Sequence, residues 1–526
     1  MAATQTLVAG QIENQRPQER AGSISLLATA ALTVLAVLIH GYHPYAEDGG
    51  IYLPGILRLI HPELYPTWTG FVTAQTRFSL FAPAIASFVR FTGISLMSCI
   101  FGVYVLSIWG TLYAAWLLAL RCMESQEARY GAISILALCI TAPAAGTSLL
   151  LIDPYVTARS LSTPLGILAL VGTLDFVSDF KRSARMRKSP VALAAVSLLI
   201  AAAMHPLMAS YAAACVVMLL CASISTALLR SLALAGLGFF TLLVATLINL
   251  LAPVPPRGYA EVALSRSYWF LSGWQWYEIA GIVAPLILLW AIGRNTTILN
   301  ERGRWLARMG LYAGLIGLEI SLIFARQSAH NYSVAMLQPL RIFHMIYIVM
   351  FLLIGAMLAA VFLDRDRLRW TATFLVFGAL MYFVQVETFP HSSHIELPGR
   401  SPSNDWEQGF FWIRNSTPLD ATFALDAKYI ESFGEDAQNF RAIAERSALP
   451  DYTKDGGIAA VDPALTPEWL KGEAIQIGLA TMSDEQRVAK LAQAQVRWLL
   501  LPRSSSTAFV CPYQNRVLRV CQLPAR

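Results

Sequence analysis

Two adjacent carboxylates, Glu47 and Asp48, are the side chains in this sequence best suited to chemistry. They lie within the stretch His40-Gly-Tyr-His-Pro-Tyr-Ala-Glu47-Asp48-Gly-Gly-Ile-Tyr52, which follows the first apolar segment. A carboxylate there can act as general base for a sugar hydroxyl or bind a hard cation such as Mg²⁺ or Mn²⁺. The glycines behind the pair allow a sharp turn. Because aspartate is also a favoured N-cap, a capping pair for a helix starting near Ile51 is an equal alternative.

Two arginines stand where apolar segments meet polar sequence and could bind an anionic lipid substrate. Arg159 follows Asp153, and Arg341 lies between Gln338 and His344. A phosphate at the edge of a bilayer needs a cation to neutralise it, and the guanidinium group suits this task. The alternative is that both arginines extend to lipid headgroups.

Glu319 lies inside an apolar run, where an ionised carboxylate is costly and usually faces a partner or a cavity. Arg326 is seven residues further and on the same helical face, and His330 and Asn331 continue the polar stripe. A structural ion pair is the simpler interpretation. The alternative is a polar cavity, to which these side chains would contribute together with Tyr52, Gln338 and His344.

Other classes of site have little support in the sequence. His391 and His394 lack a third metal ligand, and no glycine-rich phosphate loop followed by lysine is present. The net charge of +6 is spread over segment ends, so nucleic acid is not expected as a partner.

The composition is that of an integral membrane protein. Of the 526 residues, 56% are hydrophobic and 14% are charged, whereas a soluble domain has roughly 25% charged residues. Apolar stretches of about 20 residues, the length that crosses a bilayer, recur through the first three quarters of the chain. They predict about eleven helices, over residues 23–40, 99–120, 131–151, 163–177, 190–204, 207–226, 231–251, 273–292, 309–325, 337–363 and 370–386.

The segment 78–96 is apolar enough to cross but contains Pro83 and Arg90, and we expect a re-entrant or interfacial helix. With this choice the inner loops hold fifteen lysines and arginines and the outer segments hold seven. A full crossing would reverse the bias, which contradicts the positive-inside rule. The predicted N-terminus is therefore cytoplasmic and the C-terminal tail lies outside, in a bacterial cytoplasmic membrane.

The predicted domains are a cytoplasmic tail (1–22), a transmembrane domain (23–386) with its first outer loop at 41–98, and an extracytoplasmic α/β domain (387–526). In the last domain we expect strands at 422–425 and 496–501, an amphipathic helix at 484–495 and a hairpin at 508–523. Cys511 and Cys521 would lie in an oxidising compartment, where a disulfide can form.

The acidic pair in the first outer loop, the interfacial helix and the exported C-terminal domain together resemble the GT-C superfamily of membrane glycosyltransferases. The resemblance implies an all-α polytopic domain, a polyprenyl-phosphate-sugar donor and an acidic residue of the first loop as base or metal ligand. Here that residue is Asp48, with Glu47 beside it. The segments 412–426 and 439–446 are similar to the start of the exported domain in several bacterial GT-C-like proteins.

The expected function is transfer of a hexose or pentose from a polyprenyl-phosphate carrier to a saccharide, lipid or protein acceptor on the outer face of the membrane. Asp48 and Glu47 would be catalytic, and Arg159 and Arg341 would bind the donor phosphate. The alternative is a transporter or flippase of lipid-linked saccharides, or a GT-C-shaped scaffold without activity. The sequence does not specify a cofactor beyond Mg²⁺ or Mn²⁺ at Asp48.

Overall fold

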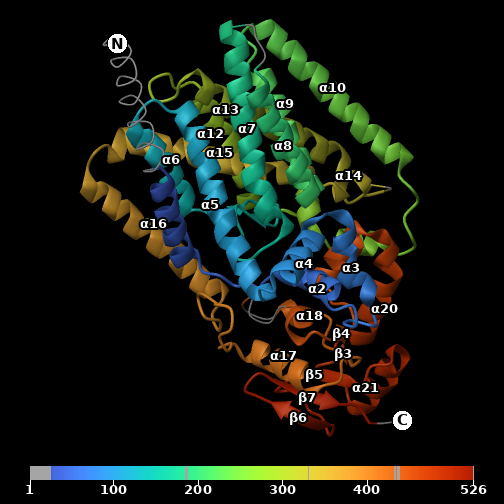
Figure 1. Ribbon diagram of the computed structural model, residues 1–526. Coiled ribbons are helices and arrows are strands. Elements are labelled where there is room, and N and C mark those ends of the chain that lie inside the picture. The colour runs from blue at the N-terminus through green and yellow to red at the C-terminus, as the bar shows by residue number, and fades with distance from the viewer. Residues whose placement is uncertain (1–24, 184–186, 330, 432–433, 435–438, 525–526) are drawn as a thin grey trace.

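The protein is a mostly helical membrane protein with a small mixed sheet at its C-terminal end (Figure 1). The computed structural model describes residues 25–524, except 184–186, 330, 432–433 and 435–438. The predicted cytoplasmic tail, 1–22, lies outside the described residues.

The helical part consists of long apolar helices and short connecting ones. The long ones are Ser25–His40, α5 (Leu96–Cys122), α6 (Gln126–Leu138), α7 (Ala158–Ser183), α8 (Lys188–Met204), α9 (Pro206–Ala222), α10 (Ala227–Leu251), α12 (Trp276–Ile292), α13 (Glu301–Phe324), α15 (Phe343–Leu358) and α16 (Arg367–Thr388). The short ones are α2 (Gly49–Ile60), α3 (Thr69–Phe78), α4 (Phe81–Thr92), α11 (Tyr259–Leu264), η1 (Ser267–Trp269), η2 (Leu271–Gly273), α14 (Ser333–Met336), η3 (Pro339–Ile342) and the π-helical turn η4 (Ala359–Leu363).

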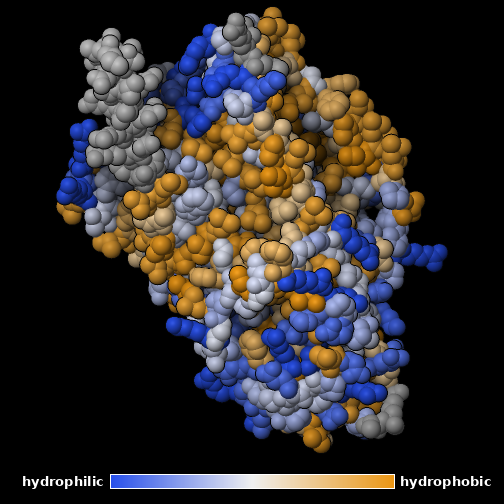
Figure 2. Space-filling view, in the orientation of Figure 1, coloured by the Kyte–Doolittle hydropathy of each residue, from blue (hydrophilic) through white to orange (hydrophobic). Residues whose placement is uncertain are grey.

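Six helical segments of the described chain are long and apolar enough to cross a membrane: α5, α7, α10, α13, the segment Ser333–Leu363 and α16. Several other apolar helices, including α8, α9 and α12, have 16 or 17 residues. Figure 2 shows apolar surface over the helical part and hydrophilic surface over the C-terminal end. Helices α10 and α16 lie at opposite edges in Figure 1 and are mostly exposed, so their apolar side chains suit contact with lipid.

Ten of the eleven predicted apolar segments are helical over most of their length, and the segment 131–151 is the exception. Its helix, α6, ends at Leu138 after 13 residues, or about 20 Å at the rise of an α-helix. A hairpin of β1 (Pro143–Ala144) and β2 (Leu149–Leu150) follows. Proline interrupts the helical pattern, and Gly146 and Ser148 have positive φ angles of 67° and 56°. The segment is apolar because it is largely buried in the protein, so the prediction of one long helix was wrong.

The predicted interfacial segment, 78–96, contains α4, a helix of 12 residues that is too short to cross. It lies beside α2 and α3 at the end of the helical part that carries the C-terminal sheet (Figure 1). Phe88 and Phe91 of α4 are exposed. The position of α4 at the membrane interface stays a prediction.

The C-terminal region has a five-stranded mixed sheet in the order β4-β3-β5-β7-β6. Its elements are α17 (Asp405–Ser416), β3 (Thr422–Ala424), η5 (Tyr429–Glu431), α18 (Phe440–Ala444), β4 (Ser447–Ala448), α19 (Lys454–Val461), η6 (Pro463–Leu465), α20 (Thr466–Gln476), α21 (Asp484–Leu491), η7 (Ala492–Ala494), β5 (Trp498–Pro502), β6 (Val510–Gln514) and β7 (Leu518–Gln522). Strand β3 pairs in parallel with β4 and β5, whereas β7 is antiparallel to β5 and β6. The two strands, the amphipathic helix and the hairpin predicted for the tail are confirmed.

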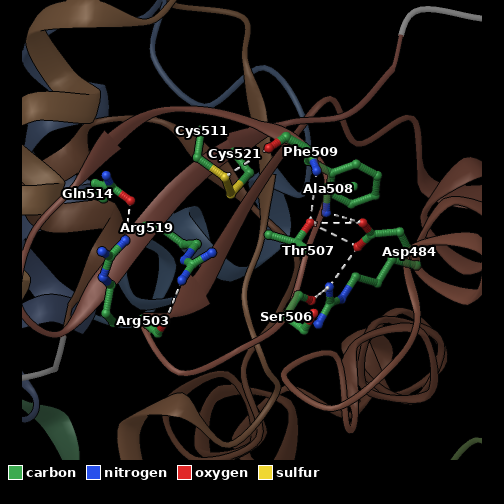
Figure 3. Close-up of a disulfide and its surroundings, with 11 residues drawn as sticks. Asp484, Arg503, Ser506, Thr507, Ala508, Phe509, Cys511, Gln514, Arg519 and Cys521 are labelled. Atoms are coloured by element: carbon green, nitrogen blue, oxygen red, sulfur yellow. Dashed lines mark hydrogen bonds and ion pairs between the residues drawn. A yellow bond between two sulfur atoms is a disulfide. The ribbon is translucent and has the colours of Figure 1, made fainter.

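Cys511 and Cys521 form a disulfide between the neighbouring strands β6 and β7 (Figure 3). Nearby, Asp484 accepts hydrogen bonds from the Thr507 hydroxyl and the Ala508 amide and thus ties α21 to the loop before β6. The other five cysteines are free thiols in the helical part.

Close helix packing generates the first testable prediction. A Cβ on Gly131 of α6 would lie 2.2 Å from the Cβ of Ala359 and 2.5 Å from the Gly355 carbonyl oxygen. Gly131→Val should therefore force α6 away from α15 and destabilise the protein by about 1–3 kcal/mol. Thermal unfolding in detergent measures this loss. Gly236→Val is the matched control, because nothing lies within 4 Å of Gly236 on α10. Equal melting temperatures for the two variants would contradict the packing.

Candidate functional site

A cavity of about 1080 Å³ lies between the helical part and the C-terminal region. Its walls come from the first loop, the β1–β2 hairpin, the starts of α7 and α9, the loop before α12, η3, α16 and α19. The ionisable and polar lining includes Glu47, Asp48, Tyr52, Asp153, Arg159, His205, Arg266, Tyr268, Glu278, Gln338, Arg341, Gln385, Glu431 and Lys454. Irregular backbone inside a membrane protein is tolerated where it lines such a cavity, which accounts for the hairpin after α6.

The acidic pair occupies the turn that leads into α2. Glu47 has a φ of 43°, a left-handed conformation that is uncommon outside glycine and often found at functional sites. Asp48 is the residue before α2, yet its side chain caps no backbone N–H. The capping alternative for Asp48 is therefore excluded, and its carboxylate is directed elsewhere.

The two glycines after the pair act through close packing rather than through a special φ angle. A Cβ on Gly49 would lie 2.5 Å from the Pro44 carbonyl oxygen, and one on Gly50 would overlap the Asn439 side chain. Asn439 itself donates a hydrogen bond to the Glu47 carbonyl oxygen at 3.2 Å. Because the glycines have no side chains, the C-terminal region can pack against the acidic turn.

Arg159 lies at the start of α7 and contacts two carboxylates. Its guanidinium donates to Asp48 Oδ2 at 3.2 Å and to Asp153 Oδ2 at 2.8 Å. The side chains of Arg159 and Asp153 are 6% and 4% exposed, whereas Asp48 is 31% exposed and borders the cavity. Burial raises the pKa of Asp153, and the Arg159 charge opposes this shift. The positive charge of Arg159 is thus balanced within the protein.

Arg341, the second predicted phosphate ligand, has different surroundings. It precedes α15, and its Nε lies 3.4 Å from the Thr147 carbonyl oxygen of the hairpin. Its guanidinium is 5.5 Å from the Tyr268 ring centre. Among the described residues no carboxylate is within 4 Å of it, so its charge is open to an anion in the cavity. The prediction that Arg159 and Arg341 both bind the donor phosphate stays a prediction, but the two arginines are not equivalent.

Lys454, at the start of α19, is a residue of this cavity that sequence reasoning missed. Its ammonium group contacts the Glu47 carboxylate and lies 3.7 Å from Asp48 Oδ1. Burial lowers the pKa of Lys454 to about 7. No local pattern marks this lysine, because its partners are at the other end of the chain.

Arg266 holds the segment before Lys454 in place. Its guanidinium donates to the carbonyl oxygens of Thr453 and Tyr452 at 2.5 and 3.1 Å. Arg266 precedes η1 in the helical part, so this contact joins the two regions directly.

The remaining predicted residues divide into two groups. Tyr52 and Gln338 line the cavity. His344 is buried on α15, where its Nε2 is 2.9 Å from the Leu151 carbonyl oxygen, so it positions the segment after the hairpin. His205, which also lines the cavity, accepts a hydrogen bond from the Met208 amide and caps the start of α9.

Glu319 and Arg326 do not contribute to the cavity. The packed face of α13 contains Gly310, Ala313, Gly314, Gly317 and Ser321, and Glu319 points away from it. Arg326 is exposed and donates to the Leu322 carbonyl oxygen. No ion pair joins Glu319 to Arg326 in the described part of the chain, so the predicted pair is wrong. Equal spacing along a helix does not specify which face packs. His330 lies outside the described residues.

The carboxylates do not form a site suited to Mg²⁺ or Mn²⁺. No group of three potential metal ligands is found among the described residues. Asp48 and Asp153 share one guanidinium, and Lys454 lies on the other side of Asp48. A divalent cation would have to displace these positive charges. The sequence also contains the histidine pair His391 and His394. Of these, His394 contacts the Leu38 carbonyl oxygen.

The chain is similar, at low sequence identity, to two solved transferases. The oligosaccharyltransferase AglB of Archaeoglobus fulgidus, solved with an inhibitory peptide and a dolichol-phosphate, matches 91% of this chain and 69% of its own, with 10% identity and a TM-score of 0.46. The arabinofuranosyltransferase AftD from Mycobacteria matches 96% of this chain with 14% identity and a TM-score of 0.48. This chain spans 40% of the length of AftD. No protein-family model and no curated protein matches the sequence.

The position of Arg159 generates a prediction about stability. Arg159→Met leaves the buried Asp153 carboxylate without its counter-charge, which should destabilise the protein by about 3–5 kcal/mol. The pKa of Asp153 then rises further, so the folded state holds a proton that the unfolded state has lost. The loss of stability should therefore grow as the pH rises above the ordinary pKa range of an aspartate.

Melting temperatures in detergent across a pH series test this expectation. Arg257→Met serves as the control, because Arg257 is exposed and lines no part of the cavity. A pH-independent melting temperature for Arg159→Met would contradict the assignment of Arg159 as the counter-charge of Asp153.

Proposed function

We propose that this protein is a membrane glycosyltransferase that moves a hexosyl or pentosyl group from a polyprenyl-phosphate donor to a saccharide, lipid or protein acceptor. The observation that carries the proposal is one cavity with an acidic turn on one wall and, on another, an arginine that pairs with no carboxylate in the described part of the chain. A base and an anion-binding cation are the two groups that this transfer needs.

In the proposed reaction Asp48 accepts the proton of the acceptor hydroxyl. The hydroxyl oxygen attacks the anomeric carbon of the donor, and the bond between that carbon and the phosphate oxygen breaks. Its electron pair leaves with the polyprenyl phosphate. Asp48 suits this role because its carboxylate borders the cavity while Arg159 holds one of its oxygens.

The leaving phosphate gains negative charge as the bond breaks. A cation beside it therefore stabilises the transition state more than the bound donor. Arg341 is the proposed ligand of this phosphate. The lipid chain would reach the cavity past α16, which contributes Val384, Gln385 and Thr388 to the wall and is mostly exposed on its other sides.

The proposed topology has a cytoplasmic N-terminus and an extracytoplasmic domain at 387–526, in the cytoplasmic membrane of a bacterium. The distribution of lysine and arginine supports this orientation. The disulfide between Cys511 and Cys521 supports it independently, because disulfides persist in oxidising compartments.

Replacing the proposed base should abolish the reaction. Asp48→Asn keeps the side-chain shape but cannot accept the proton, so transfer should fall by at least about 100-fold while membrane insertion stays normal. The assay incubates purified protein with polyprenyl-phosphate sugars and acceptors and measures released polyprenyl phosphate. Glu319→Gln, outside the cavity, is the matched control. Wild-type protein that binds the donor but releases no carrier phosphate would favour the transporter or scaffold alternative.

Replacing the proposed phosphate ligand should affect donor binding. Arg341→Met should raise KM for the donor by about 10-fold or more, because a charge-assisted contact to phosphate is lost. Arg326→Met is the control, since Arg326 is exposed and outside the cavity. An unchanged KM in steady-state kinetics would remove Arg341 from the donor site.

A further inference from the structure

Lys454 belongs to the C-terminal region but extends its side chain to the acidic turn of the first loop. The side chain is 10% exposed, and its ammonium group contacts Glu47 and approaches Asp48. A buried ammonium group is costly unless carboxylates compensate for it. The position of Lys454 is therefore tied to the presence of the acidic pair.

Both regions of the protein fix the backbone at Lys454. Within the C-terminal region, Asp451 Oδ1 accepts the Lys454 amide at 2.6 Å. From the helical part, Arg266 donates to the two carbonyl oxygens just before Lys454. The lysine is thus fixed at the junction instead of lying on a free surface.

The charges around Lys454 can be assigned to partners. Asp455 accepts two hydrogen bonds from Arg441 at 2.7 Å and the Asp451 amide at 2.9 Å, and Asp451 accepts backbone amides. On the other side, Asp48 shares Arg159 with Asp153. Lys454 contacts the Glu47 carboxylate and lies near that of Asp48. Without its positive charge the two adjacent carboxylates would repel each other more strongly.

We propose that Lys454 is a positioning residue for the transfer reaction: its ammonium group holds the Glu47 and Asp48 carboxylates in the orientation in which Asp48 accepts the acceptor proton. The inference rests on the proposed function and adds to it a requirement that the C-terminal region be docked for catalysis. Lys454 acts through the carboxylates and makes no contact with the donor phosphate, which Arg341 binds.

The test compares Lys454→Met, which keeps the length of the side chain and removes its charge, with Lys454→Arg, which restores the charge. Lys454→Met should lower kcat by about 10- to 100-fold, the effect of a misplaced reacting group, with little change in KM for the donor. Lys454→Arg should recover most of the loss. Lys471→Met, at an exposed position of α20 outside the cavity, should match the wild type.

A double-mutant cycle separates positioning from a general loss of structure. If Lys454 acts on Glu47, the effects of Lys454→Met and Glu47→Gln on kcat should not add. Each single variant leaves one charge of the pair without its partner, whereas the double variant contains neither charge. Additive effects, an unchanged kcat in Lys454→Met, or a loss confined to KM would each overturn the inference while leaving the proposed function intact.

Hydrogen exchange provides a measurement that does not depend on activity. Peptides that cover residues 44–56 should exchange faster in Lys454→Met than in the Lys471→Met control, because the acidic turn loses an anchor. Equal exchange in the two variants would overturn the positioning role. Wild-type protein that transfers no sugar would defeat the proposed function and the catalytic role of Lys454 together, and the exchange data would still report whether the lysine anchors the turn.

Discussion

A buried guanidinium between two carboxylates organises the cavity. Arg159 begins α7, Asp153 lies in the segment after the hairpin, and Asp48 lies in the first loop, so one group of charges fixes three separate segments. Breaking a buried charge pair leaves the other partner uncompensated, which is far more costly than losing a surface ion pair. The same contact holds one oxygen of Asp48 and leaves the carboxylate at the cavity wall. The contacts of Arg159 therefore contribute both to the stability of these segments and to the orientation of the proposed base.

The cavity exists because two regions of different chemistry meet. The helical part supplies apolar walls and the hairpin, whose irregular backbone is tolerated because it lines the space. The C-terminal region supplies Lys454 and Asn439, and Arg266 of the helical part holds the segment before Lys454. Neither region alone provides a complete set of charges. The C-terminal region therefore takes part directly in the proposed chemistry through Lys454.

Local sequence patterns predicted the strands and most of the helices correctly, but they predicted the contacts between charged side chains poorly. The strands and hairpin of the tail followed from alternation and turn residues within short windows, and the structure has them. The helix predicted at 131–151 was wrong because apolar sequence marks burial in a protein as readily as contact with lipid. The Glu319–Arg326 pair was wrong because α13 ends at Phe324, so the helical spacing from Glu319 does not extend to Arg326. The Asp48 side chain does not cap α2, and its carboxylate contacts Arg159 instead.

The sequence alone determined that this is a multi-pass membrane protein with a C-terminal sheet region, because apolar length and residue alternation are local properties. It also singled out Asp48, Arg159 and Arg341, three residues that line one cavity. Only the tertiary structure decided that Arg159 pairs with carboxylates, that Arg341 has no carboxylate beside it among the described residues, and that Lys454 contacts Glu47. Asp48 and Arg159 are 111 positions apart, and Glu47 and Asn439 are 392 apart. The interaction between two charges depends on their distance in space, and one sequence without its fold does not contain that distance.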